Sequence, residues 1–147
     1  MAQQVSTTIE IDAPPERVWA VLADLASYPQ WHPVFLSVTG QLAAGSTLTI
    51  TTTHPTSGRA MTANVKVRTA EPGTELRWVS KLLGLTISER RFLLSPAAGG
   101  TSLVQDGTYR GLGRGRGRGT VKTVSRIQDA FAAINQAIKQ RAESLPN

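Results

Sequence analysis

The chain alternates between two hydrophobic periods, one typical of strands and one typical of helices. Ile9 and Ile11 alternate with acidic residues, which indicates a strand with one exposed face. Pro15 followed by Glu16 is typical of a helix start. The apolar positions then step by three or four, at Val18, Trp19, Leu22 and Leu25. This order predicts a strand that leads directly into an amphipathic helix.

A period of two returns after this helix and lasts for most of the chain. β-branched and apolar residues alternate with polar ones between Gly- and Pro-containing turns, which predicts antiparallel strands. The predicted strands lie near 34–39, 46–53, 60–70, 74–81, 86–95 and 101–110. From Val121 to Leu145 the period changes again, and one apolar stripe that includes Ile127 and Phe131 predicts a long helix.

Four segments, in this order and spacing, resemble the START-like helix-grip superfamily (SRPBCC), in its bacterial polyketide cyclase/dehydrase and lipid-transport branch. They are IEIDAPPERVWAVLADLASYPQWHP (9–33), GQLAAGSTLTI (40–50), RTAEPGTELRWV (68–79) and ERRFLLSPAAGGTSLV (89–104). The resemblance covers nearly the whole chain and implies a single α+β domain over 1–147. It further implies a seven-stranded curved antiparallel sheet wrapped around the long C-terminal helix, with two short helices after the first strand.

Composition narrows the class of protein. A chain of 147 residues is one domain's worth, and the absence of cysteine excludes disulfides and thiolate chemistry. The start MAQQVSTTIE has neither the basic segment nor the apolar run of a signal peptide, and eighteen apolar residues never stand together. We therefore expect a cytoplasmic protein without a membrane span, and the sequence leaves the oligomeric state open.

The net charge of +6 is concentrated in one segment, because six basic residues and no acidic one lie between Arg110 and Arg126. Within it, glycine stands at every second position from Gly111 to Gly119 and alternates with arginine from Gly113 onward, without the spacing of a dinucleotide- or phosphate-binding motif. This Gly-Arg loop has three interpretations. It is a solvated loop, or a gate whose arginines attract an acidic group of a ligand, or a nucleic-acid arm. Nucleic acid is the weakest, since the repeat has no aromatic residues. The arginines concerned are Arg114, Arg116 and Arg118.

A hollow between the sheet and the last helix is the expected place for a small, mainly hydrophobic ligand, such as a lipid, fatty acid or polyketide-like molecule. Aromatic side chains are concentrated beside the first helix, and others alternate with apolar residues along the strands. Each of these rings is either part of the core or a ligand contact. The candidate ligand-binding residues are Trp31, Phe35, Trp78, Phe92, Tyr109, Leu112, Ile127 and Phe131.

His32, in the Trp31-His32-Pro33 sequence, is the best candidate for acid–base chemistry, and its alternative is a structural polar role. His54 stands in a predicted turn, where we expect it to be exposed. Arg90 shares a strand face with Phe92. If that face is the concave one, a buried guanidinium needs an anion or an acidic partner; if it is not, Arg90 is a solvated charge. Tyr109 is a weaker candidate for orienting a substrate carbonyl oxygen.

The sequence contains no metal-binding spacing, no nucleophile elbow and no pair of interior carboxylates, so we expect no metal and no cofactor. The favoured hypothesis is ligand binding. The alternative is an enzyme of polyketide cyclase/dehydrase type, in which His32 transfers a proton while Tyr109 or Arg90 orients carbonyl oxygens.

Overall fold

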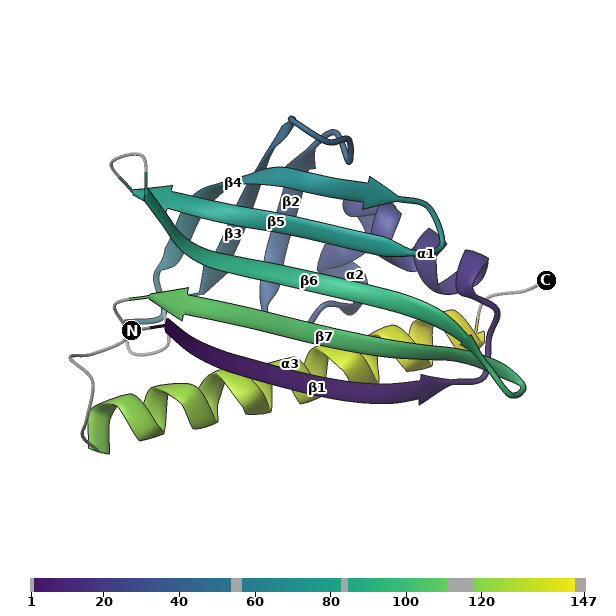
Figure 1. Ribbon diagram of the computed structural model, residues 1–147. Helices are drawn as coiled ribbons and strands as arrows, with labels where there is room; N and C mark the ends of the chain where they lie inside the picture. Colours follow the sequence, from purple (N-terminus) through teal and green to yellow (C-terminus); the bar gives the residue numbers. More distant parts are fainter. Residues whose placement is uncertain (1, 54–56, 83–84, 111–117, 145–147) are drawn as a thin grey trace.

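The computed structural model of the protein describes residues 2–53, 57–82, 85–110 and 118–144. These residues form one antiparallel sheet of seven strands, in the order β1-β7-β6-β5-β4-β3-β2, with helices packed against one face (Figure 1). The strands are β1 (Ala2–Ile11), β2 (Phe35–Gly40), β3 (Thr47–Thr53), β4 (Ala60–Glu71), β5 (Glu75–Leu82), β6 (Leu85–Ala97) and β7 (Gly100–Arg110). The helices are α1 (Pro15–Ala23), the short 3₁₀ turn η1 (Leu25–Ser27), α2 (Tyr28–Trp31) and α3 (Arg118–Ser144).

The first and last strands of the chain are neighbours in the sheet. β1 pairs with β7, from Ala2 opposite Arg110 to Ile11 opposite Thr101. The register shifts in three strand pairs: β2–β3 at Phe35/Ser37, β4–β5 at Val67/Thr69 and β5–β6 at Ser80/Lys81. The extra residue belongs to β2, β4 and β6, respectively. Such irregularities bend a strand and increase its twist, so they contribute to the curvature of the sheet. The helices cover one face of the sheet, the helix-facing face, and the other is the outer face.

The long helix α3 runs along β1 and packs against α1 near its C-terminal end (Figure 1). Its buried positions follow helical spacing, at Phe131, Ile134, Asn135, Ile138 and Ala142. Polar contacts tie this half of the helix to the chain near the end of β1. The Glu143 carboxylate accepts the backbone N–H of Asp12 at 2.7 Å, and Lys139 Nζ donates to the Glu10 carbonyl at 3.0 Å.

The predicted α+β helix-grip architecture is confirmed, including the seven strands, the long C-terminal helix and the short helices after the first strand. Most strand boundaries differ from the predicted ones by one or two residues, and two elements begin earlier than predicted by more than that. β1 begins at Ala2, because its polar first half is paired with β7, a contact that local periodicity does not reveal. The last helix begins at Arg118 rather than near Val121, which places Gly119 in the first turn, where a helix has few hydrogen bonds to lose. His54 lies outside the described residues.

Candidate ligand-binding site

Aromatic rings from α2 and β2 form a stacked cluster under the curved sheet. The Tyr28 hydroxyl donates to the Leu22 carbonyl at 2.6 Å, and Trp31 Nε1 donates to Ser27 Oγ at 3.2 Å. The first bond holds α2 against α1, and the second ties it to η1. The His32 and Phe35 rings stack with centroids 4.1 Å apart and planes at 6°. The Tyr28 ring lies nearly parallel to both, with its centroid 5.5 Å from His32 and 6.4 Å from Phe35.

His32 is buried, with 9 % of its surface exposed, and its Nδ1 atom accepts two backbone N–H groups. These come from Val34 at 3.1 Å and Phe35 at 2.9 Å. Burial, together with the positive charge of Arg90, lowers the pKa of His32 to about 3. The ring is therefore neutral near pH 7 with its proton on Nε2. It can donate a hydrogen bond through Nε2, while its other nitrogen is already occupied.

Arg90 lies on the helix-facing face of β6, among four aromatic rings. Its guanidinium carbon is 4.7 Å from the ring centre of Phe131. The corresponding distances are 5.5 Å to Phe35, 5.6 Å to Trp78 and 5.5 Å to Phe92. The ring faces stabilise the cation. Burial nevertheless lowers the pKa of Arg90, and the phenols of Tyr109 and Tyr28 act in the opposite direction.

A chain of neutral polar side chains holds the Arg90 guanidinium in place. Arg90 Nη2 donates to Gln105 Oε1. Gln105 Nε2 donates to Asn135 Oδ1 at 2.6 Å and to the Phe131 carbonyl at 3.3 Å. Asn135 Nδ2 donates to Thr7 Oγ1 at 2.8 Å. Gln105 and Asn135 are almost completely buried, so this amide relay joins β6, β7, α3 and β1 inside the protein.

Gly107 makes room for the aromatic rings beside Arg90, which is its pairing partner in the sheet. A Cβ atom at Gly107 would lie 2.7 Å from the Phe131 ring and 2.7 Å from the Tyr109 ring. Tyr109 is half-buried, and burial raises its pKa while the Arg90 charge opposes that shift. Glycine at this position therefore lets both rings approach the strand backbone.

A narrow hollow lies between the aromatic cluster and α3, and it is too tight to admit a water molecule. Four of the predicted ligand-binding residues line it together, namely Trp31, Phe35, Trp78 and Phe92. Its other walls are Leu22, Tyr28, His32, Ile134 and Ile138. Phe131 and Arg90 lie next to this hollow through their contact with its rings.

Of the other predicted ligand-binding residues that the structure describes, Tyr109 and Ile127 do not line this hollow. Tyr109 packs over Gly107, and Ile127 is half-buried on α3. Arg118 is the first residue of α3. Leu112, Arg114 and Arg116 lie outside the described residues, so the three interpretations of the Gly-Arg loop stay predictions.

Sequence reasoning missed Gln105, Asn135 and Gly107. A signal existed for two of them, since Gln105 and Gly107 alternate with Leu103 on the inward positions of β7 and break its apolar pattern. Asn135 lies one residue from the apolar stripe of the last helix. Its importance depends on β1 and β7, which are distant in sequence.

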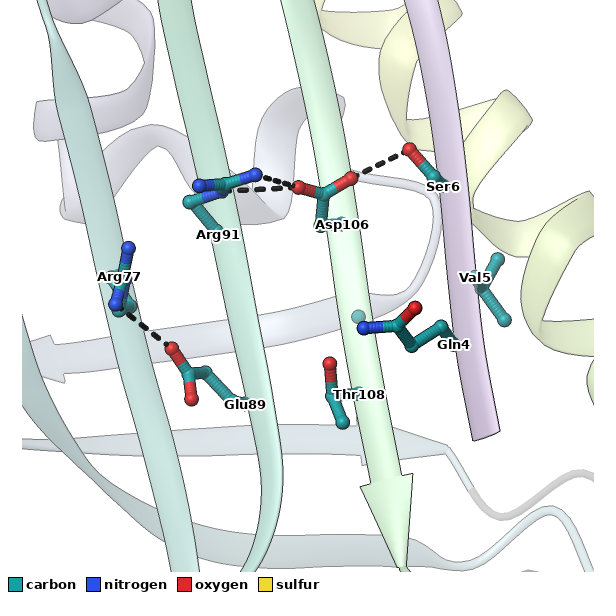
Figure 2. A pocket seen from close by; sticks show the side chains of 9 residues that line it. Gln4, Val5, Ser6, Arg77, Glu89, Arg91, Asp106 and Thr108 are labelled. Atoms are coloured by element: carbon teal, nitrogen blue, oxygen red, sulfur yellow. Dashed lines mark hydrogen bonds and ion pairs between the residues drawn. The ribbon is translucent and has the colours of Figure 1, made fainter. Parts of the chain in front are cut away.

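A larger hollow, of about 480 Å³, lies on the outer face over β1, β7, β6 and β5. Figure 2 shows that its charged side chains are turned toward one another. Arg91 is paired with Asp106, whose other oxygen accepts the Ser6 hydroxyl at 2.6 Å. Arg77 is paired with Glu75 at 3.0 Å and with Glu89 at 3.2 Å. The Arg91–Asp106 and Arg77–Glu89 pairs cross-link neighbouring strands, whereas the Arg77–Glu75 pair lies within β5. Each of these carboxylates already has a cationic partner.

Within the described part of the chain, no three His, Asp or Glu side chains are arranged to hold a metal ion. Among the same residues, no helix combines the length and the apolar character needed to cross a membrane.

A curved antiparallel sheet, a long C-terminal helix and an aromatic interior with few polar groups define a helix-grip protein. The chain belongs to the family described as polyketide cyclase / dehydrase and lipid transport, whose model matches residues 2–143. No curated protein sequence is significantly similar to it.

Solved structures with the same fold include proteins described as aromatase/cyclases. The Zhui aromatase/cyclase from Streptomyces sp. R1128 superposes with a TM-score of 0.74 at 18% identity, covering 97% of this chain and 94% of that one. The di-domain ARO/CYC BexL, from the BE-7585A biosynthetic pathway, gives 0.76 at 19% identity, covering 99% of this chain and 51% of its own. Ara h 8.0201 gives 0.74 at 14% identity, covering 99% and 100%. At these identities the likeness is one of fold.

Proposed function

We propose that the protein binds a small, mainly hydrophobic ligand, such as a lipid, a fatty acid or a polyketide-like molecule, between the sheet and α3. The observation that carries this proposal is the hollow lined by Trp31, Phe35, Trp78 and Phe92 and closed by Ile134 and Ile138 of α3. Rings and aliphatic side chains from α1, α2, β2, β5, β6 and α3 converge on it. Apolar walls with a few polar groups are typical of sites for such ligands.

The hollow must widen when a ligand enters, because ligand pockets usually measure about 300–1,000 Å³. The part of α3 from Val124 to Ala130 is the segment best suited to move. Its side chains are exposed or half-buried, whereas Phe131, Ile134 and Ile138 are buried. A displacement of the 124–130 segment breaks few buried contacts and opens the space next to Phe131 and Arg90.

Native mass spectrometry of the purified protein, followed by titration with the neutral fluorescent probe N-phenyl-1-naphthylamine, tests this proposal. We expect either a retained hydrophobic molecule or saturable probe binding. Ile138→Phe places extra volume in the hollow and should weaken binding at least fivefold. Leu36→Phe adds a ring at a residue that is 49% exposed and should leave binding unchanged. Absence of binding in the wild type, or equal binding in Ile138→Phe, would overturn the proposal.

A second candidate function is catalysis of the polyketide cyclase/dehydrase type. It is favoured by the hydrogen-bond donors beside the hollow, the Arg90 guanidinium and His32 Nε2, which are suited to polarising carbonyl oxygens. His32→Ala separates the two functions. An enzyme should lose activity on a poly-β-keto substrate, whereas a binding protein should keep its affinity for N-phenyl-1-naphthylamine within about twofold.

A further inference from the structure

Arg90 is a half-buried cation with a buried Nε atom, and it has no acidic partner among the described residues. The ion-paired cations in this part of the chain, Arg77, Arg91 and Lys139, each contact a carboxylate. Arg90 instead bonds to the neutral amide of Gln105, and its Nε atom is buried with no hydrogen-bond partner. A buried charge is costly unless it is paired and hydrogen-bonded. Among the described residues, the Arg90 guanidinium therefore lacks an anion that would compensate its charge.

The aromatic rings around Arg90 do not supply this missing negative partner. Phe131, Phe35, Trp78 and Phe92 offer ring faces to the guanidinium but no hydrogen-bond acceptor. A guanidinium has five N–H donors in a fixed planar arrangement that matches the two oxygens of a carboxylate. With the described residues it uses one of its terminal nitrogens, toward Gln105. The remaining donors are unused by this part of the chain.

The amide relay explains why the guanidinium stays in position without an anion. Gln105 is held by Asn135 and by the Phe131 carbonyl, so its oxygen is fixed toward Arg90. This pre-orders the donor group before a ligand arrives, which lowers the entropic cost of binding. The relay is neutral, so it positions Arg90 without cancelling its charge.

We infer that the ligand carries a single carboxylate on a mainly apolar body, and that this carboxylate binds Arg90 while the body occupies the ring-lined hollow. The inference rests on the proposed function and adds the chemical class of the ligand. One charge is indicated, because Arg90 is the cation that contacts the rings, and the described residues that line the hollow are themselves uncharged. A phosphate monoester, with nearly two charges at pH 7, would leave one uncompensated.

Two pairs of molecules with the same shape and different charge test the inference. They are 2-naphthoate with 2-naphthamide, and dodecanoate with dodecanamide, titrated by calorimetry at pH 7. In the wild type we expect the carboxylate of at least one pair to bind at least tenfold more tightly than its amide. Arg90→Met should reduce that preference to less than twofold. Arg91→Met removes the same charge from the outer face and should keep it.

Two further measurements keep the test independent of how Arg90→Met folds. Gln105→Glu keeps Arg90 and gives it an internal carboxylate, so the preference for the anion should again disappear. In the wild type, lowering the pH through the ligand's own carboxyl pKa, about 4–5, should weaken carboxylate binding and leave amide binding unchanged.

The outcomes separate this inference from the proposed function. Equal affinity for carboxylate and amide in the wild type would overturn the inference and leave hydrophobic ligand binding standing. A preference that survives in both Arg90→Met and Gln105→Glu would also overturn it. Failure of all four molecules and of N-phenyl-1-naphthylamine to bind would overturn both.

Discussion

Arg90 and Arg91 are consecutive residues of β6 whose side chains meet opposite environments. Arg91 lies on the outer face, where it is paired with Asp106 (Figure 2). Arg90 lies on the helix-facing face, where its guanidinium carbon is 4.7 Å from the centre of the Phe131 ring. Because successive side chains of a strand point to opposite faces, one residue cross-links the sheet and the other is left as an unpaired cation in the interior. This contrast supplies a matched control for experiments on Arg90.

Gln105→Leu should destabilise the protein, because Arg90 and Asn135 both lose their buried partner. Leaving a buried polar group unsatisfied costs about 1–3 kcal/mol, so we expect the free energy of unfolding to fall by at least that amount in urea titrations. Gln4→Leu, at an exposed position of β1, should change it by less than about 0.5 kcal/mol. Equal stability of the two variants would contradict the relay.

Gly107→Ala should displace the rings that pack over β7. The new methyl group would meet Phe131 and Tyr109 at 2.7 Å, and overpacking of this kind costs about 1–3 kcal/mol. Because Phe131 also lies over Arg90, the near-ultraviolet circular dichroism and tyrosine fluorescence should change as well. Thr108→Ala, the adjacent half-buried position on the outer face, is the control. An unchanged unfolding midpoint in Gly107→Ala would contradict the packing.

His32 should make stability depend on pH above the range in which carboxylates titrate. The folded-state pKa is lowered to about 3 from 6.5, so between these values the unfolded state binds the proton and the folded state does not. Stability is therefore complete above about pH 6.5 and falls as the pH decreases, by up to about 1.4 kcal/mol per pH unit.

Urea titrations between pH 5 and 7 measure this dependence. His32→Asn keeps a hydrogen-bond acceptor and has no ionisable group, so it should flatten the pH profile in that window. A slope that persists unchanged in His32→Asn would assign the effect to another group.

The Gly-Arg loop provides a test of the nucleic-acid hypothesis. We expect no retention of a single-stranded oligonucleotide by the wild-type protein at physiological salt, because the loop lacks aromatic stacking residues. Retention that falls steeply with salt, and disappears when Arg114, Arg116 and Arg118 are replaced by alanine, would reverse this prediction.

The sequence by itself determined the fold class and most of the elements. Periods of two and of three to four residues are local properties, so the strands and the stripe that contains Phe131, Ile134 and Ile138 could be recognised without any knowledge of their partners. The same alternation placed Arg90 and Phe92 on one face of a strand. The sequence also places Trp31 and Phe35 in the segment that directly follows the first helix.

Only the tertiary structure decided which face is buried and which distant groups meet there. Arg90, Gln105 and Asn135 belong to β6, β7 and α3, and their hydrogen bonds depend on strand register and on how α3 lies along β1. Side-chain alternation along a strand does not predict these contacts, because it defines two faces without indicating which one the helices will cover. The pairing of strands and the packing of α3 made Arg90 an interior cation rather than a solvated charge.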